Sequence, residues 1–465
     1  MPYTPHTQSD IKEMLDVIGL EKESDLFDSV PDHLKVSHMN LPDGLDEFST
    51  FNKFKKLAAK NVTDKTIFLG GGYYDHIVPS AVDALSGRSE FYTAYTPYQA
   101  EASQGTLQVL YEYQSLICEL TGMEVSNASM YDGATALAEA ALMAVRISRR
   151  NKVLVDAGVN PTYIEVVKTY LAFRDIEVEV IELDKDKADF SKVEEKIDKT
   201  VAAYLFQNPN FLGSTQDFTN IIEKLHENKA LAVMSAYPVS LGLLKDPGSL
   251  GVDIVSADGQ CLGNYLSFGG PSFGMIATRE KYIRNLPGRI IGRTVDKDDK
   301  EMFVLTMQAR EQHIRRQRAT SNICSNQNLI ALRSTIFLSL IGKTGLKDMA
   351  TICHSKSEYL KSQLENLYKV DIFNTTSTFN EFVITTPLKS DDLLSKLSEQ
   401  GFYAGINLSN LFDGFENSIL ISVTEKRTKE EMDELVKAIG GLVWVSQWQY
   451  LINHKKEEKV LSYHL

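Results

Sequence analysis

The sequence has few cysteines and no net positive charge. Its four cysteines, Cys118, Cys261, Cys324 and Cys353, are far apart and form no CxxC pair. This spacing argues against a disulfide framework or a zinc site and fits a reducing compartment. With 49 lysines and arginines against 62 aspartates and glutamates, the formal net charge is −13. A chain this acidic is a poor candidate for binding nucleic acid or an anionic membrane, although a local basic patch can still bind a small anion.

The sequence also lacks long apolar segments. Its N-terminal stretch, MPYTPHTQSDIKEML, contains no apolar core of the kind found in signal peptides. No run approaches the roughly 20 apolar residues that a helix needs to cross a bilayer. We therefore expect a soluble, cytoplasmic protein without a membrane segment. At 465 residues and 43% hydrophobic composition, the chain is long enough for two domains with a substantial core.

One segment, residues 253–274, lacks a residue that its pattern leads us to expect. It reads DIVSADGQCLGNYLSFGGPSFG: a buried strand end, a polar turn, an apolar loop and a glycine-rich return into a second strand. In α/β enzymes that act on amines, a lysine that forms a Schiff base usually follows such a strand end, before the paired glycines. No lysine occurs between Lys245 and Lys281. A well-formed frame without its lysine is the most informative feature of the sequence.

Residues 126–278 alternate short apolar strands with helices. The strands show no polar–apolar alternation, as in a parallel sheet covered on both faces. The β-α-β order predicts right-handed crossovers and one doubly wound sheet. Ligands of such sheets bind beyond the carboxyl ends of the strands, which here carry QNPN at 207–210, SAYP at 235–238 and DGQ at 258–260. The helix that starts near Gly133 presents free backbone N–H groups, a natural anion site.

We expect four parts along the chain. Residues 1–65 form an N-terminal arm of the kind that usually wraps a neighbouring subunit or its own domain; a loosely packed extension is the alternative. Residues 66–328 form a large α/β domain and residues 329–445 a smaller α+β domain. Residues 446–465, which end in a charged stretch, form an exposed tail.

A triple glycine at residues 70–72 follows an apolar strand and resembles a phosphate loop. It matches neither GxGxxG nor GxxxxGKS, so dinucleotide and P-loop sites are poorly supported. A tight turn that brings the backbone close to another chain explains the glycines at least as well.

Two polar blocks are candidates for a binding site. The first, FYTAYTPYQAEASQ at 91–104, places tyrosines and amides ahead of a predicted helix. Ordinary packing is the usual explanation for such a cluster, but its polar groups would need partners if buried. The second, QAREQHIRRQRATSNICSNQ at 308–327, is rich in arginine, whose forked guanidinium suits carboxylate or phosphate. As a single helix it would pair Glu311 with Arg315, so a solvated helix face is the alternative.

Together these segments resemble one known family. The sequences YTPYQAEASQG, GQCLGNYLSFGGPSFG, LPGRIIGRTVD and, above all, QAREQHIRRQRATSNICSNQ are similar to the glycine cleavage system P-protein. This family is the glycine dehydrogenase (decarboxylating) that depends on pyridoxal 5′-phosphate (PLP). The resemblance covers roughly residues 1–445. Within the family, the length and the missing lysine point to subunit 1, the α subunit of the two-subunit bacterial form.

The resemblance implies a type I PLP-dependent transferase (aminotransferase-like) fold, in which a doubly wound, mostly parallel sheet is joined to a smaller C-terminal α+β domain. It implies an α2β2 heterotetramer in which the β subunit carries PLP, so that this chain does not hold the cofactor covalently. The implied reaction converts glycine and lipoylated H-protein into aminomethylated H-protein and CO2.

A PLP site of this fold needs a lysine and an acid that faces the pyridine nitrogen. The lysine is missing, and the strand end at 235–238 offers Ser, Ala and Tyr where the acid would lie. We therefore expect no certain catalytic residue in this chain. Because such enzymes close each site with a second chain, our candidates for reaching the partner's pocket are Tyr95, Thr96, Tyr98, Gln99 and Gln104. Our candidates for anion contacts or interface order are His313, Arg315, Arg316, Thr320, Ser321 and Asn322.

Other hypotheses remain open. The chain could be a catalytically silent scaffold or regulatory subunit of the same complex. It could also be a stand-alone type I PLP decarboxylase with a displaced lysine. A nucleotide-binding α/β module ranks last because no phosphate-loop motif matches.

Overall fold

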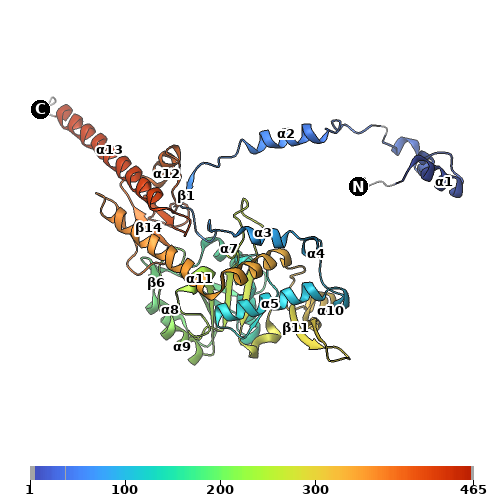
Figure 1. Ribbon diagram of the computed structural model, residues 1–465. Coiled ribbons are helices and arrows are strands. Elements are labelled where there is room, and N and C mark those ends of the chain that lie inside the picture. The colour runs from blue at the N-terminus through green and yellow to red at the C-terminus, as the bar shows by residue number, and fades with distance from the viewer. Residues whose placement is uncertain (1–5, 37, 462–465) are drawn as a thin grey trace. The chain divides into compact units, whose positions relative to one another are not determined.

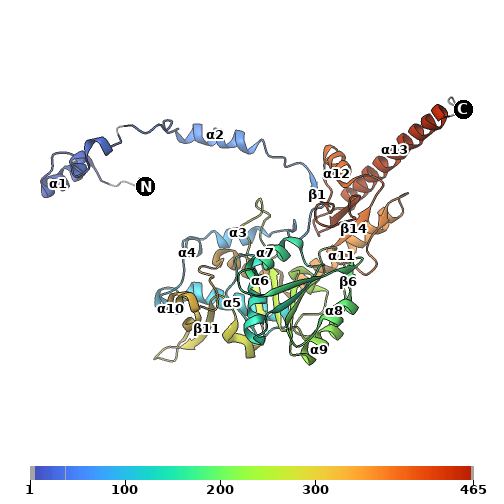
Figure 2. The ribbon, with the colours of Figure 1, turned by 180° about the vertical axis from the view of Figure 1, so that it is seen from behind.

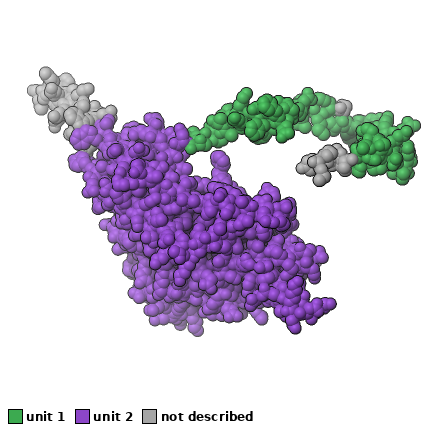
Figure 3. Space-filling model, viewed as in Figure 1, with its two compact units in different colours: residues 1–63 green, residues 64–465 purple. Residues whose placement is uncertain are grey.

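The computed structural model describes residues 6–36 and 38–461, with side chains as far as Val445. The chain divides into two compact units, residues 1–63 and residues 64–465 (Figure 3).

The first unit contains two helices, α1 (Gln8–Ile18) and α2 (Glu47–Ala58). Helix α1 begins after Thr7, whose side chain and that of Asp10 form a capping box, and it ends at Gly19 in the left-handed conformation. Within the described residues of this unit Leu15 is buried, whereas many large apolar side chains are exposed, among them Val17, Phe27, Leu41, Phe48 and Phe51. The unit therefore has little core of its own, and the predicted role of residues 1–65 as an arm stays a prediction.

The second unit is built on a seven-stranded sheet in the order β2-β10-β9-β8-β7-β3-β4. Figures 1 and 2 show the helices that surround the strands of this unit. Five strands are parallel: β3 (Lys152–Asp156), β4 (Glu177–Ile181), β7 (Val201–Asn208), β8 (Leu231–Ala236) and β9 (Ile254–Asp258). Strand β10 (Gly274–Thr278) pairs antiparallel with β9 and with β2 (Val125–Ser126). The predicted α/β class with a doubly wound, mostly parallel sheet is confirmed.

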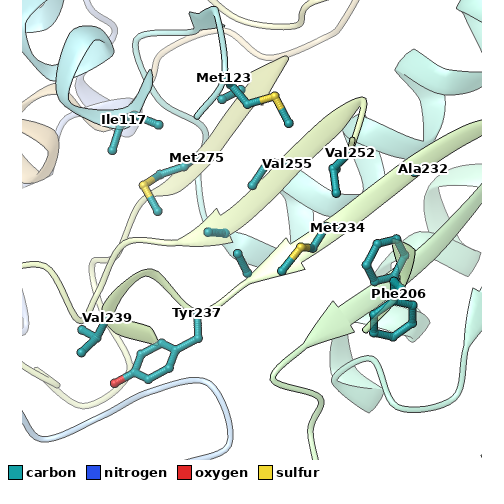
Figure 4. Packing of buried hydrophobic residues seen from close by; sticks show 14 of the residues in the cluster. Ile117, Met123, Phe206, Ala232, Met234, Tyr237, Val239, Val252, Val255 and Met275 are labelled. Carbon is teal, nitrogen blue, oxygen red and sulfur yellow. The ribbon is translucent and has the colours of Figure 1, made fainter. Parts of the chain in front are cut away.

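Helices cover both faces of this sheet, because successive side chains of a strand point to opposite faces and the central strands carry apolar side chains on both. Val153, Leu205 and Val233 pack with α6 (Gly133–Ser148) and α7 (Pro161–Leu171). Their neighbours on the same strands, such as Tyr204 and Met234, face the opposite core, part of which is drawn in Figure 4. That core is covered by α5 (Gln104–Thr121), α8 (Phe190–Lys196), α9 (Thr219–Glu227) and α11 (Asn328–Glu365).

Helix α11 is long and apolar enough to cross a membrane by length and composition alone. It is interrupted at Gly342, whose φ is 58° and ψ is −173°. Its first half packs against α5 and against α3 (Ser80–Ser86), and it buries Phe337 completely. Arg333 in this half pairs with Asp83 of α3 at 2.7 Å. These are the contacts of a helix packed within the protein.

The C-terminal part of the unit has a four-stranded sheet of its own, in the order β13 (Asp371–Ile372), β14 (Glu381–Thr385), β17 (Ser418–Ser422) and β16 (Ile406–Asn407). Helices α12 (Ser390–Glu399) and α13 (Lys429–Leu461) contribute to its core, which includes Phe382, Leu393 and Leu435. Helix α13 thus continues into the tail that we predicted for residues 446–465.

Short elements complete the unit. Strands β1 (Thr66–Ile67) and β15 (Phe402–Tyr403) pair in parallel. Two hairpins join β5 (Leu183–Asp184) to β6 (Lys187–Ala188) and β11 (Ile290–Val295) to β12 (Glu301–Thr306). The remaining helices are α4 (Ser89–Tyr92) and α10 (Gln312–Arg315).

The block at residues 308–327 is not a single helix. Helix α10 is one turn long and lies between two 3-10 turns, and Arg316 ends it with φ 52° and ψ −124°. The Arg315 guanidinium donates from Nε to the Ala309 carbonyl at 3.0 Å. The alternative of a solvated helix face with a Glu311–Arg315 pair is therefore wrong, because the backbone leaves the helical conformation within one turn.

The triple glycine packs against the C-terminal sheet of the same chain. A Cβ atom on Gly70 would lie 2.1 Å from Glu381 Oε1 and 2.5 Å from Ser422 Cβ. The next N–H, on Gly71, donates to Glu381 Oε1 at 2.7 Å, and the Tyr74 hydroxyl donates to Glu381 Oε2 at 2.8 Å. The glycines thus serve close packing within the chain, and neither a phosphate loop nor an approach to another chain is needed to explain them.

We predict that Gly70→Ala destabilises the protein, because the added methyl group overlaps atoms of two buried strands. The free energy of unfolding, measured by urea denaturation, should fall by about 1–3 kcal/mol. Gly105→Ala is the matched control: this glycine lies in α5, and no atom lies within 4 Å of the added Cβ. It should stabilise the protein by about 0.5–1 kcal/mol. Equal effects of the two substitutions would contradict the packing of this loop.

We also predict that Glu381 makes stability depend on pH. Burial raises its pKa to about 7, although the Gly71 N–H and the Tyr74 hydroxyl oppose the shift. The folded state therefore binds this proton more tightly than the unfolded state, where the pKa is about 4.3. The resulting stabilisation is complete below that value and is lost as the pH rises through about 7.

The comparison is with Glu381→Gln, which keeps an acceptor for Gly71 but cannot titrate. The free energy of unfolding of the wild type, minus that of the variant, should fall by about 2–3 kcal/mol between roughly pH 5 and pH 8. Subtraction removes the contribution of other buried carboxyls, such as Asp156, whose pKa burial raises to about 6. Parallel pH profiles for the two proteins would refute the shift.

Candidate functional site

The carboxyl ends of β7, β8 and β9 meet at one edge of the sheet, where ligands of doubly wound sheets bind. The cavity there is lined by ten residues: Gly72, Tyr74, Asn160, Tyr163, Gln207, Ser235, Ala236, Tyr237, Pro238 and Asp258. Its volume is about 30 Å³, which is enough for one or two water molecules. Ligand pockets usually measure about 300–1,000 Å³. The side chains of this chain therefore fill the cleft.

The main obstacle to a ligand in this cleft is Asp258, the last residue of β9. Its Oδ2 accepts a hydrogen bond of 2.9 Å from the N–H of Gly133, the first residue of α6. Asp132 Oδ1 accepts from the Thr135 N–H at 2.8 Å. The anion site that we predicted at this helix end is thus already occupied by carboxylates of the chain itself. Burial raises the pKa of Asp258 to about 6, against the opposing bonds from Ser272, the Gln260 N–H and the Gly133 N–H.

These residues do not fit a PLP group bound in this chain's own cleft. Residues 253–274 contain no lysine. At the end of β8, Ser235 and Ala236 are buried and supply no acid. The first turn of α6, where a phosphate would be expected to bind, is closed by Asp258 and by Tyr163, whose hydroxyl lies 2.5 Å from a Cβ built on Gly133.

A buried polar network next to the cleft was missed by the sequence analysis. His76 Nδ1 lies 2.6 Å from Glu425 Oε2, and His76 Nε2 is hydrogen-bonded to the Tyr237 hydroxyl. Cys353 Sγ donates to the same Glu425 oxygen at 3.3 Å. Burial favours the neutral form of Glu425, but its bonds to His76 and the Ile77 N–H outweigh burial and lower its pKa to about 2. The members are 349 residues apart at the extremes, so no local pattern could reveal them.

Histidine, cysteine and glutamate are also metal ligands, and the three ligand atoms of His76, Cys353 and Glu425 lie within 4.8 Å of one another. All three atoms are joined by hydrogen bonds. The network is therefore satisfied as a structural connection between the loop that follows the triple glycine, helix α11 and the C-terminal part of the chain.

A second and larger pocket brings together residues from both predicted blocks. It has a volume of about 540 Å³. Its lining includes the predicted candidates Tyr98, His313, Arg316 and Asn322. Arg289, which belongs to the segment LPGRIIGRTVD but was not a candidate, lies in its wall. Its side chain stacks on the Tyr98 ring at 5.3 Å and donates to the Tyr98 hydroxyl at 3.2 Å.

The other candidates of the first block lie outside this pocket. Tyr95 is 79% exposed and borders a small apolar hollow with Phe91 and Leu332. Gln99 is exposed and Thr96 is half-buried. Gln104 uses its amide within the chain, since Nε2 donates to the Phe303 carbonyl at 2.8 Å and Oε1 accepts from the Phe303 N–H at 2.9 Å. Gln104 therefore joins α5 to β12 in this structure.

Three candidates of the second block also have internal roles or point elsewhere. Arg315 is exposed and bonds to the Ala309 carbonyl. The Thr320 N–H donates to the Arg310 carbonyl at 3.0 Å. The Ser321 hydroxyl donates to Glu139 Oε1 at 2.8 Å, and burial raises the pKa of that carboxyl.

Comparison with known proteins gives a consistent result. The family model described as "Glycine cleavage system P-protein" matches residues 1–439. The chain is 52% identical over 443 residues to the "Probable glycine dehydrogenase (decarboxylating) subunit 1" of Geotalea uraniireducens (strain Rf4), which covers 95% of this chain and 100% of the relative.

Solved structures agree. A crystal structure of glycine decarboxylase (P-protein) of the glycine cleavage system, in inhibitor-bound form, matches with a TM-score of 0.88 and 40% identity over 95% of this chain and 100% of that chain. The glutamate decarboxylase of Lactobacillus brevis matches with a TM-score of 0.64 over 89% of this chain and 96% of that chain, but at 13% identity this likeness concerns the fold alone. The predicted type I PLP-dependent fold is thus confirmed, and the chain belongs to the glycine cleavage system P-protein family.

Proposed function

We propose that this chain is the subunit of a two-subunit glycine decarboxylase that does not hold the cofactor, and that it completes the active site of its partner. As a member of this family, the chain acts as the α subunit of the glycine cleavage P-protein, an enzyme that uses PLP. The relatives named "subunit 1" imply a second subunit. The finer statement, that the partner alone carries PLP on a lysine, is our proposal.

One observation supports it above the others: Asp258 Oδ2 accepts from the Gly133 N–H at 2.9 Å. A carboxylate in this position repels a phosphate and satisfies the donor that a phosphate would need. Together with the absent lysine and the filled cleft, it removes the two usual attachment points of the cofactor from this chain.

The chain's own contribution to the reaction is to bind, orient and exclude water. Tyr95 and Gln99 are exposed, and Tyr98, His313, Arg316 and Asn322 line one open pocket. Phenol, amide and guanidinium groups of this kind can hold the glycine carboxylate in a fixed position while a covering chain excludes water. PLP, when bound on the partner, supplies the electron sink for the loss of CO2.

We propose further that the assembly is an α2β2 heterotetramer with the glycine dehydrogenase β subunit, located in the cytoplasm. In it, the aminomethyl group derived from glycine passes to the lipoyl group of H-protein. The exposed apolar side chains of residues 1–63 are suited to cover a neighbouring subunit.

Substitution of exposed tyrosines separates an active-site role from a silent scaffold. In the complex with the β subunit, Tyr95→Phe and Tyr98→Phe should each lower kcat/KM for glycine–bicarbonate exchange by about tenfold, through the loss of one positioning hydrogen bond. Tyr92→Phe is the matched control, because Tyr92 is also exposed and lies in the same segment. Size-exclusion chromatography should show an unchanged assembly. Wild-type turnover in both variants would favour the scaffold or regulatory role.

Chemical labelling tests where the cofactor is held. After incubation with PLP and reduction with borohydride, mass spectrometry of the complex should find a stoichiometric pyridoxyl group on a lysine of the β subunit. The same treatment of this chain alone should give no stoichiometric label. A single fully labelled lysine in the isolated chain would instead support the stand-alone decarboxylase with a displaced lysine.

A further inference from the structure

Arg289 is a buried cation without a carboxylate partner. The residue is only 6% exposed and lies between Gly288 and the start of β11. Its hydrogen bonds go to neutral oxygens: Nη1 donates to Asn326 Oδ1 at 3.1 Å, and Nη2 donates to the Tyr98 hydroxyl at 3.2 Å. Among the described residues, no carboxylate oxygen lies within 4.0 Å of it.

The neutral acceptors are held firmly in place. The Asn326 amide donates from Nδ2 to the Ala128 carbonyl and to Ser129 Oγ, both at 3.0 Å, so its oxygen is turned toward Arg289. The Arg289 carbonyl accepts from the Ala128 N–H at 2.8 Å. The guanidinium is thus fixed against the loop that precedes α6 and does not swing out into solvent.

Burying a guanidinium in this way destabilises the folded state unless an anion binds to it. A buried charge without a counter-ion loses hydration that neutral hydrogen bonds replace only in part. A guanidinium has five N–H donors, and two of them are used here. Arg289 also lines the pocket of about 540 Å³ described above, which has the size of a ligand site.

Besides Arg289, the pocket is lined by a second arginine, one histidine and one acid. Arg316 and His313 line it together with Arg289, and Glu311 is the acid in its lining. His313 packs edge-on against Tyr98 at 6.4 Å, which extends the wall around the guanidinium. The pocket therefore combines a fixed fork of donors with a second guanidinium, that of Arg316.

We propose that this pocket is a binding site for a small oxyanion, a carboxylate or a phosphate, and that the Arg289 guanidinium is its principal ligand. Planar, forked donors bind both groups in a bidentate manner, and Tyr98 fixes the plane of the fork by stacking. This inference deepens the proposed function, which places the glycine carboxylate in the same pocket, but its observations come from this chain alone. If the proposed function holds, the oxyanion bound in this pocket also contacts the active site of the partner subunit.

The test is the thermal stability of the isolated full chain as acetate or inorganic phosphate is added at constant ionic strength, with chloride as the balancing anion. A ligand that binds the folded state raises Tm in a saturable way. We expect saturation with at least one of the two. The anion that saturates at the lower concentration identifies whether the site prefers a carboxylate or a phosphate.

Variants of Arg289 assign the effect to the pocket. Arg289→Gln should weaken binding of the preferred anion by at least about tenfold, and Arg289→Lys, which keeps the charge without the fork, should also weaken it. Arg293→Gln is the matched control, since Arg293 lies nearby in β11 and pairs with Glu301 on the surface. It should bind as the wild type does.

A purely structural role of Arg289 is excluded if the oxyanion reverses which protein, the wild type or Arg289→Met, has the higher Tm. Without an oxyanion, Arg289→Met should have a Tm equal to or above that of the wild type, because it removes an uncompensated buried charge. With saturating oxyanion, the wild type should be the more stable protein.

Three results would overturn the proposal: no saturable effect of either anion on the wild type, equal affinity in Arg289→Gln, or a Tm of Arg289→Met that is below the wild type without oxyanion. If Arg289→Gln does not fold, unchanged affinity in Arg289→Lys overturns it. None of these measurements involves the partner subunit, so their failure is distinct from a failure of the turnover test.

Discussion

The bond between Asp258 and the first turn of α6 decides what this molecule can do. In a doubly wound sheet, that helix end and the adjacent strand ends are the place where an anionic ligand is expected to bind. Here the carboxylate at the end of β9 is buried and accepts from the Gly133 N–H, the Ser272 hydroxyl and the Gln260 N–H. The chain has thus kept the fold of a PLP enzyme while its own side chains satisfy the polar groups that a cofactor would need.

Other carboxylates around the cleft also form hydrogen bonds with groups of the same chain and not with a ligand. Glu381 accepts from Gly71 and Tyr74, and Glu425 accepts from His76, so that the loop after β1 is tied to the C-terminal sheet by buried carboxylates. Buried carboxylates are costly unless fully bonded, and several here keep raised pKa values. The free energy lost by burying these carboxylates is compatible with a rigid, closed cleft. A site that binds and releases a ligand needs open volume and donors without partners.

Much of the fold could be predicted from the sequence because it is encoded locally. Apolar runs such as 201–206 predict covered parallel strands, and the missing lysine in 253–274 is visible without any structure. The site was harder, because its contacts join distant segments: Gly133 and Asp258 are 125 residues apart, and His76 and Glu425 are 349 apart. At 308–327, an i,i+4 pattern left a solvated helix face as the alternative, and the structure excludes it because Arg316 adopts φ 52°. An i,i+4 pair stabilises a helix that has formed, but it does not show whether tertiary contacts allow the helix to form.

Hydrogen-bond donors without partners are found in this chain at the second pocket, not at the cleft. In the cleft at the carboxyl ends of β7, β8 and β9, Asp258 accepts from the Gly133 N–H and the remaining volume is about 30 Å³. At the second pocket the volume is about 540 Å³, and Arg289 is buried against neutral oxygens with donors left over. A chain that only supported a partner by packing would gain stability by replacing that arginine with an apolar residue. The presence of this arginine in this geometry is the physical reason to propose that the pocket lined by Tyr98, His313 and Arg289 binds a ligand, whereas the closed cleft does not.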